Sequence, residues 1–345
     1  MIRIFIYLLL TAFGGALLFA SFAFCLPEDE VRFVVPPNWP QPVYNFASNP
    51  LNANAFKLGR SLFFDPVLSR DSTVSCVSCH LQFTGFTHVD HSLSHGVNGL
   101  KGTRNSLTLF NLAWNTSFMW DGGVNNLEVQ PLNPITSSVE MASSLKDIVA
   151  RLNKSVRYKR LFYLAYNDSA ITGQKVLKAL AQFTVMLESY NSKYDKYMRK
   201  EPGGEMSEAE LNGLAIYRRK CSSCHSEPLF TNNGFENNGL VPDTALMDIG
   251  RAKITGARVD YFKFRVPTLR NVAVSHPYMH DGRFRNLRQV LDHYSEGIKQ
   301  SETLARQLKN GIPLTEEEKE DLTLFLQTLT DRDFLFDLRF RNYFD

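Results

Sequence analysis

Apolar residues recur at helical spacing in separate stretches of the chain. One stretch runs from Val176 through Leu180 and Phe183 to Leu187, and residues 147–166 follow a similar pattern. Positions three and four apart lie on one face of an α-helix, so each stretch predicts a helix with one apolar side. Stripes of this kind are typical of ordinary core.

Capping residues predict where two further helices begin. Ser207 with Glu210 forms a capping box ahead of a helix that leads directly into Cys221, and Thr315 with Glu318 forms another. The apolar face of the last helix contains Leu322, Phe325, Leu326 and Leu329. Segments rich in Asn, Gly and Pro separate the helical stretches and predict long ordered loops. We therefore expect an all-α fold with extended loops.

Two copies of Cys-x-x-Cys-His, at residues 76–80 and 221–225, carry the clearest chemistry. In a c-type haem site, each thiol adds to a vinyl group of the porphyrin and the histidine ligates the iron. The sequence therefore predicts two covalently bound haem c groups. The attachment residues are Cys76, Cys79, Cys221 and Cys224, and the proximal ligands of the first and second iron are His80 and His225.

Three other uses of the cysteine pairs stay open. A zinc site is disfavoured because the pairs lie far apart and each ends in His. A thioredoxin-like redox pair would need a βαβ context and would not explain the repeated His. A structural disulfide within either pair is compatible with export, but it leaves the histidines unexplained as well.

The N-terminus has the layout of an export signal. Arg3 precedes a long apolar run, so residues 1–24 are expected to be a signal peptide or an N-terminal anchor. Cleavage after Ala23 would release the protein, whereas retention of the run would tether it to a membrane. Cys25 is an alternative site of lipid modification. All these outcomes predict a periplasmic protein.

The charge balance and the chain length bear on the partners and on the domain organisation. Lys plus Arg number 38 and Asp plus Glu number 35, without a long basic block, so we expect no nucleic-acid partner. The length fits two domains, and Pro and paired Gly at residues 200–205 mark a seam. We expect an N-terminal haem domain at 40–200 and a C-terminal haem domain at 205–345.

A second pattern also occurs twice. Met119-Trp120-Asp121-Gly122 matches Met279-His280-Asp281-Gly282, each copy is followed by Asn-Leu, and each follows an Arg-Asn pair at 104–105 or 270–271. Because each set lies downstream of one haem motif, we infer a tandem duplication in which each half builds one haem pocket.

These motifs resemble those of the bacterial di-haem cytochrome c peroxidases and their relative MauG. The resemblance covers most of the chain beyond the signal and rests on residues 58–66, 102–106, 120–122, 130–141, 267–271 and 280–282. It implies two cytochrome c-like haem domains, with a peroxidatic N-terminal haem, an electron-transfer C-terminal haem and one calcium ion between them. It also suggests a homodimer.

The resemblance assigns roles to individual residues. Gln130 and Glu140 match the distal pair that orients peroxide and moves its proton, and Trp120 matches the aromatic residue between the haems. The calcium ligands that it implies are the side chain of Asn105 and the carbonyl groups of Ser275 and Pro277. Oxygen ligands of this kind suit a hard cation.

Two positions depart from the peroxidase pattern. The distal His that blocks the first haem in many peroxidases falls on Val97, so we expect an open, high-spin ferric iron there. His88, His91 and His95 lie in the same loop, and His95 is the best substitute ligand. We expect none of the three to bind the iron strongly.

The second departure concerns the sixth ligand of the second haem. A Met normally stands fourteen residues after the His of His-Asp-Gly, but here that position is Tyr294. An anionic oxygen ligand would lower the reduction potential, and MauG has a tyrosine at this place. His293 and Met279 are alternative ligands.

The leading hypothesis is a cytochrome-c peroxidase. It would reduce hydrogen peroxide to water with electrons from a small c-type cytochrome or a cupredoxin. A MauG-like oxidase or maturase that acts on a partner protein is the alternative, favoured by Tyr294. A non-enzymatic electron-transfer cytochrome is a third reading, which Glu140 and Gln130 count against.

Overall fold

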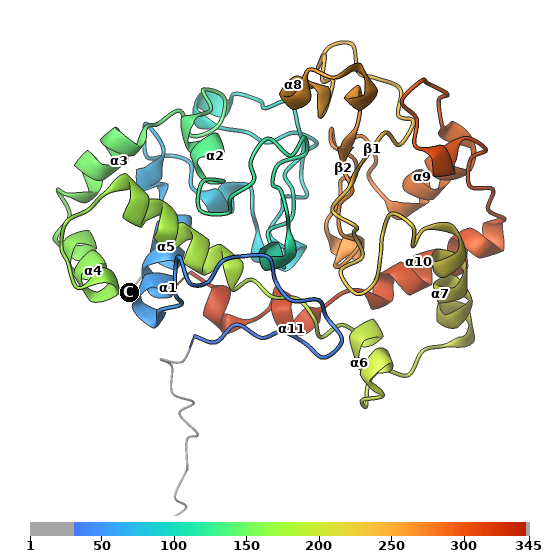
Figure 1. The fold of residues 1–345 in the computed structure, drawn as a ribbon, viewed down its shortest axis with the longest axis horizontal. Coiled ribbons are helices and arrows are strands. Elements are labelled where there is room, and N and C mark those ends of the chain that lie inside the picture. The colour runs from blue at the N-terminus through green and yellow to red at the C-terminus, as the bar shows by residue number, and fades with distance from the viewer. Residues whose placement is uncertain (1–30, 343–345) are drawn as a thin grey trace, which may run out of the picture. The chain divides into compact units, whose positions relative to one another are not determined.

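The computed structural model describes residues 31–342 (Figure 1). The expected signal or anchor at 1–24, its cleavage site and Cys25 lie outside the described residues. None of the helices within residues 31–342 has the length and apolar composition needed to span a membrane.

Helices and long loops dominate the described chain, which confirms the all-α prediction. The α-helices are α1 (Ala53–Phe64), α2 (Leu132–Thr136), α3 (Leu145–Leu152), α4 (Val156–Tyr166), α5 (Gly173–Val185), α6 (Lys193–Arg199), α7 (Glu208–Lys220), α8 (Ala252–Thr255), α9 (Leu287–Asp292), α10 (Glu316–Thr328) and α11 (Arg332–Leu335). Short 3-10 turns span Pro66–Leu68, Cys76–Ser78, Gln82–Thr84, Val97–Gly99, Leu112–Trp114, Arg258–Asp260, Val272–Val274, Arg306–Leu308 and Leu338–Phe340. The strands β1 (Phe235–Glu236) and β2 (Phe264–Arg265) pair antiparallel, with Phe235 opposite Arg265.

Helices α1 and α5 cross closely in the first half of the chain and carry the first core. The crossing depends on Gly59, because a Cβ there would lie 1.9 Å from the carbonyl oxygen of Ala179. The helical stretch expected at 147–166 is two helices, α3 and α4. The break falls where Asn153 ends α3 and the Ser155 hydroxyl caps the N-terminus of α4.

The second half repeats this arrangement with α7 and α10, which lie side by side in Figure 1. Both predicted capping boxes are confirmed: Ser207 caps α7 and Thr315 caps α10, each with the Glu three residues later bonding back. Gly213 allows the close crossing, since a Cβ there would lie 2.1 Å from the Asp321 carbonyl oxygen.

The end of the chain returns to the first core. Phe334 and Phe340 are buried among the aromatic residues of the first half. The ring of Phe334 lies 5.8 Å from that of Phe86, and the ring of Phe340 lies 6.5 Å from that of Phe56. The last residues of the C-terminal half therefore stabilise the N-terminal half, and the domain boundaries expected from sequence stay a prediction.

The duplicated Met-x-Asp-Gly motifs adopt the same tight turn. An isolated bridge closes each turn, from Phe118 to Val124 and from Tyr278 to Phe284. The backbone φ is +69° at Met119 and +75° at Met279, and both motif glycines also have positive φ. The internal repeat inferred from sequence is thus present in the geometry of the chain.

An asparagine with a left-handed backbone belongs to the same repeat. Eight residues before each Met stands an Asn with left-handed φ, which is Asn111 (+55°) in the first half and Asn271 (+56°) in the second. Asn105 has no left-handed φ, so it is not the counterpart of Asn271 in this turn. Its backbone N–H instead donates to the His280 carbonyl of the second half (2.7 Å).

A buried hydrogen-bond network joins the two halves at these asparagines. The Asn111 side chain bonds both backbone groups of Ser189, at 2.9 Å each. The Asn271 side chain donates to the Ser189 hydroxyl (2.9 Å) and accepts from the Asp331 backbone N–H (2.8 Å). The Ser189 hydroxyl donates to the Asp331 carboxylate (3.1 Å). All four residues are at most 5% exposed. Loss of any of these hydrogen bonds would therefore leave a buried polar group that water cannot reach.

We predict that Asn271→Ala lowers the free energy of unfolding of the holoprotein by about 3 kcal/mol, because it leaves buried groups of Ser189 and Asp331 without partners. Denaturant unfolding followed by circular dichroism measures the loss. Asn38→Ala is the matched control, since Asn38 is exposed and also has positive φ (+67°). Equal losses in the two variants would show that backbone strain, not the network, is responsible.

Candidate functional site

The proximal histidine of the first motif is oriented by a backbone carbonyl. His80 Nδ1 lies 2.7 Å from the carbonyl oxygen of Phe86, which can only accept, so Nδ1 carries the proton and Nε2 keeps a free lone pair. Burial lowers the pKa of His80 to about 4, so the imidazole is neutral at physiological pH. A neutral ring with a free Nε2 fits an iron ligand.

His225 is held in the same way at the second motif. Its Nδ1 lies 3.1 Å from the Pro267 carbonyl oxygen and 3.3 Å from that of Phe230, and burial lowers its pKa. His225 lines a cavity of about 220 Å³ together with Cys221 and Cys224. Apolar side chains such as Leu291 and Leu326 form much of its wall, which fits a porphyrin plane.

Arg265 provides an independent test of whether this cavity fits a haem. Its guanidinium lines the cavity wall and its Nε is buried without a hydrogen-bond partner among the described residues. Burial alone lowers the pKa of Arg265 to about 10, which leaves it charged. A buried cation needs an anion, and a porphyrin propionate would supply one. The residues present therefore fit a haem at the second motif.

The four motif cysteines are free thiols, so the structure forms no disulfide within either pair. Burial raises the pKa of Cys76 and Cys221 to about 12, so both thiols are protonated when nothing is bound to them. The two pairs also belong to separate cores. The disulfide and zinc alternatives are therefore not supported in the described part of the chain.

Trp120 connects the two halves. It is 9% exposed and lines the cavity of the second motif, although it belongs to the first half of the chain. Its indole N–H donates to the Asn105 carbonyl (2.9 Å), and its own carbonyl accepts from the Arg265 backbone N–H (2.7 Å). These bonds hold the ring at the boundary between the two predicted haem sites.

Glu140 is brought next to the first motif. Burial raises its pKa, and its charge in turn contributes to the raised pKa of the Cys79 thiol. Its carbonyl accepts from the backbone N–H of Val97 (2.8 Å), and Gly96 lies against its backbone so closely that any Cβ would clash at 2.2–2.4 Å. The loop that contains Val97 therefore fixes the position of Glu140, and Val97 itself has no atom that could bind iron.

Gln130 is placed less directly. Its side-chain amide donates to the sulfur of Met119 (3.8 Å), and among the described residues no hydrogen bond joins it to Glu140. Met119 immediately precedes Trp120, so Gln130 contacts the tight turn that carries the tryptophan. The pairing of Gln130 with Glu140 around a bound peroxide stays a prediction.

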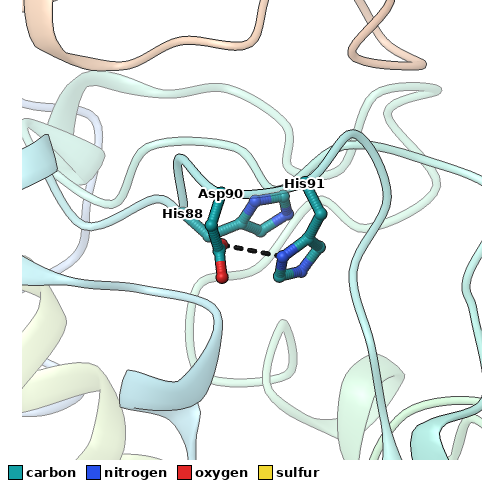
Figure 2. A group of neighbouring side chains, drawn as sticks. All are labelled: His88, Asp90 and His91. Atoms are coloured by element: carbon teal, nitrogen blue, oxygen red, sulfur yellow. Dashed lines mark ion pairs between the residues drawn. The ribbon is translucent and has the colours of Figure 1, made fainter.

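The three loop histidines form a stack. The rings of His88 and His91 lie 4.3 Å apart and those of His91 and His95 lie 4.1 Å apart, nearly parallel in both cases. Asp90 pairs with His91 Nδ1 at 2.7 Å (Figure 2). Burial lowers the pKa of His88 to about 4 and also lowers that of His95. Whether His95 reaches the first iron stays a prediction.

Two of the three expected sixth ligands line the second cavity. Tyr294 follows α9 in a π-helical turn (His293–Gly297), a distortion that often occurs at functional sites, and it faces the cavity that His225 also lines. Met279 lines the same cavity. His293 does not, and its Nε2 is engaged by the Asn238 carbonyl oxygen at 3.0 Å.

Sequence reasoning missed Asn238, which contacts both remaining ligands. Its side-chain amide donates to the Met279 sulfur (3.3 Å) and its hydrogen bond to Tyr294 opposes the effect of burial, which raises the pKa of that phenol to about 12. In the sequence, Asn238 belongs to an Asn-Asn-Gly stretch that signals only a turn. No local pattern could have revealed its role.

The residues expected to bind calcium meet at the second cavity. Asn105, Ser275 and Pro277 all line it, although Asn105 comes from the first half. The Asn105 side-chain nitrogen donates to the Ser92 carbonyl (3.0 Å), so its side-chain oxygen stays available to a cation. Ligation of calcium by these three residues stays a prediction.

Comparison with known proteins identifies the family of this chain. A family model described as di-haem cytochrome c peroxidase matches residues 53–203. The methylamine utilization protein MauG of Methylophilus methylotrophus is 33% identical over 310 residues, 88% of this chain and 89% of that protein. The cytochrome c551 peroxidase of Nitrosomonas europaea is 31% identical over 289 residues, 82% of each protein. The solved structure of a MauG-like protein associated with microbial copper homeostasis has a TM-score of 0.83 at 32% identity, covering 90% of this chain and 99% of that one.

Two haem-attachment motifs on two helical cores place the protein among the di-haem c-type cytochromes. The chain belongs to the di-haem cytochrome c peroxidase and MauG family. The resemblance inferred from sequence is thereby confirmed, and membership implies two haem c groups as cofactors. The family includes both peroxidases and MauG proteins, so membership alone does not choose between these activities.

We predict that Arg265→Gln lowers the midpoint potential of the second haem by roughly 60 mV or more, a tenfold change in the redox equilibrium. Removal of a buried positive charge favours the oxidised iron. Spectroelectrochemical titration measures the shift. Arg258→Gln is the control, because Arg258 is exposed and pairs with Glu302 at 2.9 Å. An unchanged potential in Arg265→Gln would contradict a role next to the porphyrin.

Proposed function

We propose that this protein is a di-haem cytochrome c peroxidase. Hydrogen peroxide is reduced to water at the first haem, and a small c-type cytochrome or cupredoxin donates the electrons through the second haem. When bound, the haems supply iron that accepts and releases single electrons. The proposal rests on Glu140, a partly buried carboxyl group beside the predicted attachment residue Cys79. Such a group can move protons during peroxide cleavage, whereas electron transfer alone does not require it.

Glu140 performs the acid-base step in this proposal. Cleavage of the peroxide bond requires a proton to move from the near oxygen to the far oxygen, where water leaves. As a carboxylate, Glu140 takes the first proton and returns it to the leaving oxygen. Burial raises its pKa, which makes its carboxylate a stronger base than an exposed one. Gln130 orients the peroxide by hydrogen bonding.

Trp120 provides the path for electrons between the haems. Its ring lines the second cavity, and its indole N–H is fixed on the backbone of Asn105 from the first half. An aromatic ring held in place at this boundary can relay an electron without rearranging its surroundings.

A second candidate function is that of a MauG-like oxidase or maturase that acts on a partner protein. Tyr294 favours it, because it lines the same cavity as His225, and a tyrosine bound to the iron would lower the potential of the second haem. In that case the second haem oxidises a partner rather than relaying electrons from one. The likeness to MauG and to a MauG-like protein associated with copper homeostasis supports this candidate as well.

We further propose the setting in which the protein works. Residues 1–24 direct it to the periplasm, either as a cleaved signal peptide or as a membrane tether. The two haem domains correspond to residues 40–200 and 205–345, and Asn105, Ser275 and Pro277 bind one calcium ion between them. A homodimer, as the family suggests, completes the proposal.

We predict that Glu140→Gln lowers the second-order rate of peroxide reaction by about 10²- to 10⁴-fold, because the amide cannot accept the proton. In the wild type, the rate should fall as pH drops through the raised pKa of Glu140, since protonation removes the base. Stopped-flow spectroscopy across pH measures both effects. Glu320→Gln, which changes an exposed carboxyl, should leave the profile intact. A wild-type rate in Glu140→Gln would disprove the assignment.

We predict that Tyr294→Phe raises the midpoint potential of the second haem by more than about 60 mV and changes its optical spectrum, because the anionic oxygen ligand is lost. Tyr278→Phe is the matched control, since Tyr278 lines the same cavity but its hydroxyl donates to the Val272 carbonyl at 2.8 Å. If Met279 is the ligand instead, Tyr294→Phe leaves the potential unchanged and Met279→Leu shifts it.

A further inference from the structure

The loop between the first haem motif and Trp120 gathers two imidazoles and a carboxylate in one place. His88, Asp90 and His91 each offer one ligand atom, and these atoms lie within 4.8 Å of one another. Figure 2 shows the two rings stacked, with the Asp90 carboxylate next to them. None of the three residues has a role in the proposed peroxide reaction.

The ring nitrogens of His88 have no hydrogen-bond partner among the described residues. The residue is 1% exposed, and both nitrogens are buried. His91 Nε2 is buried and unpaired as well. A buried polar atom without a partner costs about 1–3 kcal/mol, so a native protein that keeps two such rings needs a compensating ligand.

We propose that His88, Asp90 and His91 bind one divalent transition-metal ion that is separate from the haem irons. Two neutral imidazoles and one carboxylate form a donor set that suits Zn²⁺ and similar first-row ions. The ion replaces the proton shared by His91 Nδ1 and Asp90, whose atoms are 2.7 Å apart, and His88 is the third ligand. Water completes the coordination.

The geometry requires only small movements. Bonds of about 2.0–2.1 Å place neighbouring ligand atoms roughly 3.3 Å apart. The His91–Asp90 pair at 2.7 Å must therefore open slightly, and wider spacings, which reach at most 4.8 Å, must close. Asp90 can make that adjustment because its side chain is 74% exposed. His88 is already fixed by burial and needs no large rotation to take part.

The position of the ion gives it an effect on the first haem site. Four residues after His91, the His95 carbonyl oxygen lies 3.7 Å from the Cys79 sulfur, and Gly96 then lies against the Glu140 backbone. An ion on His88 and His91 would hold this segment in place. It would thereby limit how far His95 can move toward the first iron.

Metal analysis of the intact holoprotein tests the proposal. After incubation with Zn²⁺ and exhaustive dialysis, we expect one zinc per two haem irons by elemental mass spectrometry. His88→Gln and Asp90→Asn should each weaken zinc affinity at least tenfold in calorimetric titration. Asp71→Asn is the matched control, because Asp71 is also exposed but lies outside the cluster, and it should retain zinc.

These experiments measure zinc content and zinc affinity, not turnover. Their results are therefore independent of whether the proposed peroxidase activity is correct. Equal zinc retention in the wild type, Asp90→Asn and His88→Gln would overturn the site, and so would a wild type without bound zinc. Asp90→Asn changes an exposed residue, so its result stands even if the buried His88→Gln variant folds poorly.

Discussion

The arrangement of this protein depends on a buried polar junction between its two halves. Asn111 and Asn271 occupy equivalent left-handed turns, and both side chains bond to Ser189. Asp331 completes the junction through Asn271 and the Ser189 hydroxyl. Because the groups are buried, they can be satisfied only when both halves are folded and in register. The junction therefore specifies one relative placement of the two turns that carry Trp120 and His280.

That placement explains how one cavity is built from both halves. Trp120 and Asn105 come from the first half but line the cavity that contains His225 and Tyr294. Arg104 strengthens the connection, with bonds of 2.6 Å to Asp121 in its own half and to Asp248 in the other. An electron path between two haems needs a fixed separation. These partly buried contacts supply it together with Phe334 and Phe340, which pack in the first core.

Predictions from sequence succeeded where the physical cause is local. A capping box involves residues three apart, and both predicted boxes, at Ser207 and Thr315, are present. The break near Ser155 was missed, because the apolar stripe continues across it while the hydroxyl of Ser155 starts a new helix. The equivalence of Asn111 and Asn271 was also missed, since spacing alone cannot show which asparagine adopts the left-handed turn.

The sequence by itself predicted two haem attachment sites with their proximal histidines, because five adjacent residues hold that chemistry. Its apolar stripes and capping boxes predicted the all-α fold. Only the tertiary structure decided what surrounds the attachment sites. It placed Tyr294 and Met279, but not His293, at the second cavity, and left Arg265 as a buried cation facing it. Exposure and cavity walls arise from contacts between residues far apart in the chain, so no local pattern encodes them.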